Sequence, residues 1–80
     1  MTDDEIMSAI KALVDEEHSL LQKTEQGEVD DHSEKRLHAI EVALGQQWDL
    51  LRQRRALRRN GKDPNEATLR DAATIQHFRQ

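Results

Sequence analysis

The residues with the clearest chemical potential form a dense basic run. Five arginines lie within eight residues: Arg52, Arg54, Arg55, Arg58 and Arg59. The only tryptophan, Trp48, comes shortly before them. Guanidinium groups at this density can neutralise phosphates, and an indole ring can stack on a base. The sequence therefore raises a nucleic-acid hypothesis, in which Arg54, Arg55, Arg58 and Arg59 contact the ligand.

A second interpretation of the arginine run is an intramolecular charge clamp. The arginines spread around a helix instead of lining one face, and positive charge is favoured at a helix C-terminus. Residues 1–34 carry eleven acidic and two basic side chains, whereas residues 35–80 carry ten basic and five acidic ones. In an antiparallel hairpin the arginines would lie beside Asp3, Asp4 and Glu5. We favour this clamp over the nucleic-acid contact.

The second chemical set combines carboxylates with histidines. Glu17 falls within the apolar arc of its helix, where a carboxylate needs a partner. Weak candidates for a metal site are Asp15, His18, His38 and Glu41. Bundles that bind two metals use paired Glu-x-x-His motifs, and only Asp15-x-x-His18 approximates one. We favour a polar layer that fixes the register of the helices, and we expect no cofactor.

The composition limits the remaining classes of function. Gly-rich phosphate loops, His-Glu-x-x-His motifs and nucleophile elbows are absent, and the three serines have no obvious base, so we expect a protein that is not an enzyme. The chain has no cysteine, which excludes disulfides and fits a cytoplasmic location. It has no apolar run of the roughly 20 residues that a membrane-spanning helix needs.

Apolar periodicity predicts two long helices, over about residues 3–26 and 31–60. Thr2 and Glu5 form a capping box before the first helix, and Asp30 or Asp31 can cap the second. Gly27 and Gly61 are typical of residues that follow a helix C-terminus. The short connection between the helices predicts an antiparallel hairpin.

The apolar residues of the two predicted helices pair in order along this hairpin. The pairing places Leu13 near Leu44, Ile10 near Trp48, and Ile6 near Leu51. We therefore expect Trp48 in the core, with its indole N–H satisfied nearby.

The second predicted helix carries another apolar face, away from the hairpin seam. A helix with two apolar faces is sandwiched between neighbours, so this face should receive the tail or a partner subunit. We expect an all-α fold that forms a homodimeric four-helix bundle or coiled coil. The predicted interaction surface consists of Ala43, Leu50, Leu57 and Phe78.

The chain divides into a hairpin over residues 1–62 and a C-terminal tail over residues 63–80. Asp63 and Pro64 offer an N-cap and a first helical residue, with Glu66 two positions after the proline. We expect a short helical turn from here to about Arg70 or Asp71.

Several stretches of the sequence resemble a known family. They are Trp48–Ala56 followed by Gly61–Pro64, Leu13–His18 in the first helix, and Thr74–Phe78 in the tail. Together they resemble the small bacterial family catalogued as domain of unknown function 2630, over nearly the whole chain. The resemblance implies a complete small protein of actinobacterial type, and it brings no assigned activity and no catalytic residues.

These observations leave three functional hypotheses. The leading one is a cytoplasmic, self-associating interaction or adaptor module that forms a homodimer and has a possible further protein partner. The alternative is a nucleic-acid-associated protein that uses the arginine run. The weakest is metal binding between the helices. None of the three involves a membrane.

Overall fold

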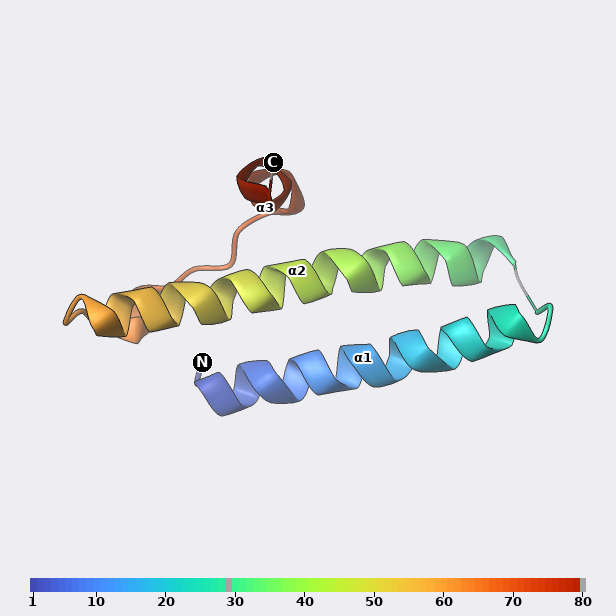
Figure 1. The fold of residues 1–80 in the computed structure, drawn as a ribbon, viewed down its shortest axis with the longest axis horizontal. Helices are drawn as coiled ribbons and strands as arrows, with labels where there is room; N and C mark the ends of the chain where they lie inside the picture. The colour runs from blue at the N-terminus through green and yellow to red at the C-terminus, as the bar shows by residue number, and fades with distance from the viewer. Residues whose placement is uncertain (29, 80) are drawn as a thin grey trace.

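The structure, a computed structural model, is an antiparallel helical hairpin followed by a docked tail (Figure 1). It describes residues 1–28 and 30–79, with the backbone alone for residues 76–79. The helices are α1 (Asp3–Glu25), α2 (Asp31–Arg59), the short 3-10 helix η1 (Pro64–Glu66) and α3 (Ala72–Arg79). The described residues contain no strand, and none of their helices is long and apolar enough to cross a membrane.

Local sequence signals set the helix ends as predicted. Thr2 and Glu5 form a complete capping box, in which the Thr2 hydroxyl accepts from the Glu5 N–H and the Glu5 carboxylate accepts from the Thr2 N–H. The Asp30 side chain accepts from the Ser33 N–H at 2.7 Å and caps α2. Gly27 and Gly61 have φ values of 81° and 71°, a region that glycine enters without steric cost.

The core lies where the N-terminal half of α1 meets the C-terminal half of α2. Ile6, Ile10, Leu50 and Leu51 form one buried cluster, with Leu44 and Ala67 packed against it. Burial of such side chains is the main stabilising contribution, at roughly 1.5–3 kcal/mol for each one that is fully buried. The buried cluster therefore lies at one end of the hairpin, while Ile40 of α2 is fully buried nearer the loop.

Two assignments within this core were wrong. Trp48, expected in the seam, is 41% exposed, whereas Leu50, expected to face outward, is only 5% exposed. At 100° per residue the two side chains lie on opposite flanks of the α2 seam. The tail covers the Leu50 flank, because Leu50 lines a cavity of about 250 Å³ together with Ala67 and Leu69. Trp48 lies on the other flank.

The tail turns back along α2 and ends in a helix, α3, that the sequence analysis does not predict. Asp63 caps η1 by accepting from the Asn65 N–H at 2.9 Å, but η1 stops after Glu66 and does not continue to Arg70. The chain then runs extended to Asp71, whose carboxylate accepts from the Thr74 N–H at 2.7 Å. The predicted end of the helical turn is thus the cap region of α3.

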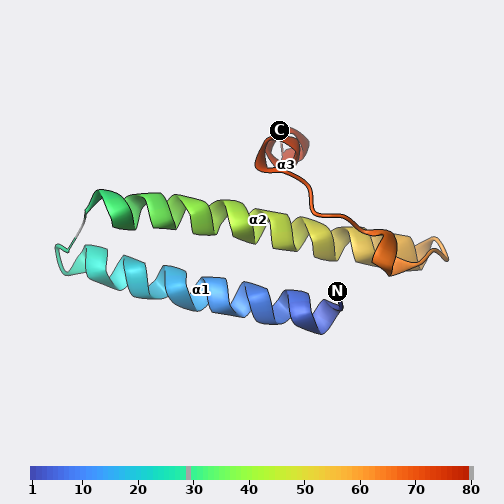
Figure 2. The same ribbon diagram turned by 180° about the vertical axis from the view of Figure 1, so that it is seen from behind.

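The helices form a thin layer. The Cα atoms span 50 × 26 × 15 Å, and α1 and α2 lie side by side within the plane of the two long dimensions. Figure 2, seen from behind, shows η1 in front of α2, so the tail crosses one side of the layer (Figure 2). Figure 1 looks at the hairpin from the side opposite η1.

Candidate functional site

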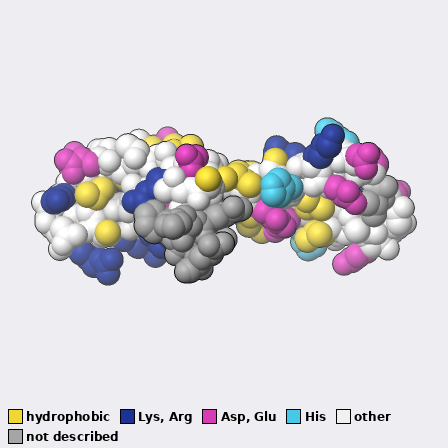
Figure 3. Space-filling view, turned by 90° about the horizontal axis from the view of Figure 1, so that it is seen from above, with side chains coloured by type: hydrophobic (Ala, Val, Ile, Leu, Met, Phe, Trp, Pro, Cys, Tyr) yellow, Lys and Arg dark blue, Asp and Glu magenta, His cyan; other side chains and the backbone are white. Residues whose placement is uncertain are grey.

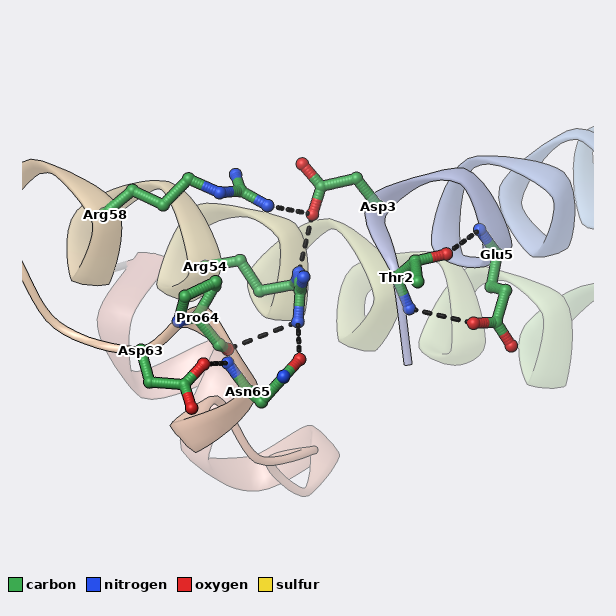
Figure 4. Close-up of polar contacts among 8 residues, drawn as sticks. All are labelled: Thr2, Asp3, Glu5, Arg54, Arg58, Asp63, Pro64 and Asn65. Carbon is green, nitrogen blue, oxygen red and sulfur yellow. Dashed lines mark hydrogen bonds and ion pairs between the residues drawn. The ribbon is translucent and has the colours of Figure 1, made fainter.

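The arginine run is anchored by Arg54, which is 6% exposed. Figure 4 shows its contacts. Its Nε donates to Asp3 Oδ1 at 2.6 Å, which ties α2 to the first turn of α1. Its Nη1 donates to the Pro64 carbonyl at 3.3 Å and to Asn65 Oδ1 at 3.0 Å, which ties α2 to η1. One planar guanidinium thus joins three segments, a task that suits its fixed fork of donors.

Arg58 completes the clamp from the next turn of α2. Its Nη2 donates to the same Asp3 Oδ1 at 2.7 Å. The hydrogen bonds from Arg58 and Arg54 lower the pKa of Asp3 to about 2 from its usual value near 3.8. The expected intramolecular clamp is therefore present, and Asp3 is its acidic partner.

The remaining arginines point away from this clamp. Arg55 and Arg59 are exposed, and Arg52 lies 3.7 Å from the buried Asp49 carboxylate. Together with Arg58 and Ala56 they line a shallow hollow on the surface of α2. Of the four predicted nucleic-acid contacts, Arg54 is buried and engaged with Asp3, Pro64 and Asn65. Arg58 is engaged with Asp3 and partly exposed, while Arg55 and Arg59 stand on the surface.

Polar side chains of α2 hold the extended tail. The Gln53 amide donates to the Thr68 carbonyl at 2.7 Å and to Asp49 Oδ2 at 2.8 Å, and its oxygen accepts from the Thr68 N–H at 3.2 Å. Gln46 donates to the Arg70 carbonyl at 3.1 Å. The extended part of the tail is thus held through its backbone, in addition to the apolar contact that Ala67 makes with the core.

The candidate metal ligands do not converge. Asp15 pairs with Lys11 at 3.2 Å on an exposed turn, and His18, His38 and Glu41 are all exposed. Across the described ranges, no group of three or more His, Asp or Glu side chains is arranged to hold a metal ion. The helical positions explain this result, because these side chains point outward from the seam instead of into it.

The polar link between the helices involves neighbours of the predicted residues. Glu16, not Glu17, bridges the helices by accepting two hydrogen bonds from Arg36, at 2.5 and 2.7 Å. The Arg36 bonds lower the pKa of Glu16 and raise that of Arg36. The sequence offers one clue to this ion pair, because Arg36 is the only arginine in the first half of the chain. Glu17 is half-buried beside Val14 in a shallow hollow.

The side of the hairpin opposite the tail leaves apolar side chains exposed. Met7, Val14 and Leu21 recur every seven residues along α1 and are 44–47% exposed. A seven-residue spacing places them in one line along the helix. Trp48 of α2 is the fourth member. We name these four residues the open face.

The helical geometry places both parts of the open face on the same side. Glu16 and the Met7 line lie on opposite flanks of the α1 seam, at 100° per residue. Arg36, the partner of Glu16, lies on the same flank of α2 as Leu50, which the tail covers. The Met7 line therefore faces away from the tail, as Trp48 does.

The interaction surface expected from the sequence has a different position. Leu50 is buried against α1 and the tail, so it cannot receive a partner, and Ala43 and Leu57 are half-buried. The side chain of Phe78 lies outside the described residues. The second apolar face of α2 is the surface on which Leu50 meets Ala67 and Leu69 of the tail.

Comparisons with known proteins identify relatives without a known activity. A family model described as "Protein of unknown function (DUF2630)" matches residues 2–80. "Uncharacterized protein Rv0898c" of Mycobacterium tuberculosis (strain ATCC 25618 / H37Rv) is 44% identical over 78 residues, which cover 96% of this chain and 90% of that protein. "Uncharacterized protein Mb0922c" of Mycobacterium bovis (strain ATCC BAA-935 / AF2122/97) matches with the same identity and coverage. No solved structure gives a significant match.

Proposed function

The chain belongs to the family described as Protein of unknown function (DUF2630), and we propose that it is a small, self-associating interaction module. The observation that carries this proposal is the open face. Four large apolar side chains, three of them in a seven-residue repeat, are exposed on the side that the tail leaves uncovered. Association through this side would convert the single layer of helices into a two-layer bundle.

The thin shape of the chain supports the same proposal. The Cα atoms span 15 Å in the shortest dimension, and within this depth the tail covers only one side of the two long helices. The described core has six buried apolar residues, which is small for a stable domain of this length. Oligomerisation is a common way to enlarge such a core.

Sedimentation equilibrium tests the proposal. We expect the wild-type chain to sediment as a dimer at hundreds of micromolar, a concentration range in which weak complexes form. Replacing Val14 and Leu21 with lysine should give a monomer, because the substitutions place charges in the apolar line. The control Ser19→Lys adds a charge on another, exposed face of α1 and should leave the dimer intact. A wild-type protein that stays monomeric over this range would contradict the proposal.

A second candidate function is nucleic-acid binding by the exposed arginines. Its support is the hollow lined by Arg52, Arg55, Arg58 and Arg59. Fluorescence anisotropy with labelled DNA and RNA at about 50 mM salt tests it, since phosphate contacts are strongest at low salt. Binding that weakens steeply with salt and is lost on changing Arg52, Arg55 and Arg59 to glutamine would support it. Absence of binding to any probe at low salt would remove it.

A further inference from the structure

We infer that two copies associate through the open face in antiparallel orientation, with the hairpin loops at opposite ends. In this arrangement α1 lies against α1 of the second copy and α2 against α2. The inference rests on the proposed self-association and adds its geometry. The occupant of the open face is a second copy of this chain, and the reason lies in the distribution of charge along the face.

The outer edge of α2 carries a graded series of charges. Glu34, Glu41, Trp48 and Arg55 follow one another at seven-residue intervals, and all four are exposed. A seven-residue interval keeps side chains in one line, so this edge runs from negative through aromatic to positive. Arg52 and Arg59 extend its positive end. The edge therefore has an acidic half near the loop and a basic half near the end of α2.

One face of the molecule shows a similar bias. Seen from above, Asp and Glu side chains are more frequent toward the hairpin-loop end, and a dense group of Lys and Arg side chains lies at the opposite end, although each end also carries some charges of the other sign (Figure 3). Asp3 at this end is already engaged by Arg54 and Arg58. The basic end thus keeps Arg52, Arg55 and Arg59 as exposed cations.

A two-fold axis perpendicular to the helices makes such a surface complementary to itself. It places the basic end of each copy against the acidic loop end of the other, and it places the Met7, Val14 and Leu21 lines of the two copies together. An axis parallel to the helices would instead set α2 of each copy against α1 of the other, so the two graded edges of α2 would not meet. The antiparallel arrangement is the one in which the acidic half of each edge faces the basic half of the other, and complementary charges of this kind favour it.

Charge reversal tests the pairing of unlike ends. Changing Glu34 and Glu41 to lysine should weaken dimerisation at least about tenfold, and so should changing Arg52 and Arg55 to glutamate, because each set opposes like charges across the dimer. An equimolar mixture of the two variants should recover wild-type affinity as a heterodimer. A chain that carries all four changes should also recover it, and this chain keeps the native net charge. If the variant with only the two glutamate changes and the variant with only the two arginine changes both dimerise as tightly as wild type, the inference is wrong.

A spin label tests the orientation directly. The chain has no cysteine, so Gln26→Cys provides one labelling site, beside the loop. Gln26 lies twelve residues past Val14, so an antiparallel dimer separates two labels by more than about 30 Å. Loops at the same end would bring them within about 25 Å, given the usual spacing of packed helices. A short distance in a formed dimer overturns the orientation and leaves self-association standing. A monomer at all concentrations removes both proposals.

Discussion

At the scale of single residues, Arg54 joins three segments of the structure: α1, α2 and η1. Its partners come from the start of α1 and from η1, segments separated by more than fifty residues in the sequence. An arginine can satisfy them together because its donors are fixed in one plane. The sequence indicated the charge clamp but not the burial of Arg54. Which of the five arginines is buried depends on the side of α2 that the tail covers, and this is a tertiary contact.

Replacement of Arg54 tests its structural weight. We expect Arg54→Ala to lower the free energy of unfolding by about 2 kcal/mol, because it removes the hydrogen bonds that the largely buried guanidinium donates, including the one to the charged Asp3 carboxylate. Arg54→Lys should recover only part of this loss, since an ammonium group lacks the fork geometry. Urea unfolding followed by circular dichroism measures both variants. Lys35→Ala, at an exposed position of α2, is the matched control and should change little.

The pKa of Asp3 predicts how the clamp responds to acid. A carboxyl pKa lowered from 3.8 to about 2 stabilises the fold at pH values above the ordinary pKa of 3.8. This stabilisation is lost as the pH falls toward 2. The difference in unfolding free energy between wild type and Asp3→Asn should therefore shrink from about pH 5 to about pH 2. Unfolding curves over this range give the difference. A gap that stays constant with pH would contradict the role of Asp3, and Asp4→Asn serves as the comparison.

At the scale of elements, the ends of α1 and α2 were predictable and the neighbours of α2 were not. Capping residues act through local hydrogen bonds, so Thr2, Asp30 and Gly61 identify helix ends from the sequence alone. The direction in which Trp48 and Leu50 point depends on which flank the tail covers, and that is a tertiary effect. Helix α3 was not predicted, because Asp71 fits the end of a preceding turn as well as the cap of a helix; its carboxylate accepts from the Thr74 N–H in the first turn of α3.

The docking of the tail on α2 depends on Gln53. We expect Gln53→Glu to release residues 67–71, because a carboxylate in place of the amide nitrogen would face Asp49 and the Thr68 carbonyl. Trypsin cleavage after Arg70 should then become at least about tenfold faster, with helix content nearly unchanged. Gln22→Glu, on an exposed turn of α1, provides the control. Equal cleavage rates in the two variants would show that other contacts hold the tail.

At the scale of the whole molecule, the single layer of helices leaves stability coupled to association. If two copies share one core, only the dimer buries the open face. Higher protein concentration favours the dimer, so the melting temperature should rise with protein concentration. We expect a measurable rise between about 10 and about 500 μM, and no rise for the chain with Val14→Lys and Leu21→Lys. Circular dichroism in cells of different path length measures both. A wild-type melting temperature independent of concentration would oppose the shared core.

The position of Arg54 also has a consequence for synthesis on the ribosome. Its partners Asp3 and Asn65 lie before and after it in the sequence, so the clamp can close only after Asn65 has left the ribosome. Helix α1 leaves the exit tunnel first and finds its core partners, Leu50 and Leu51, much later. The core contacts between α1 and α2 therefore form only after Leu51 has emerged, and the contact of Arg54 with η1 forms only after Asn65 has.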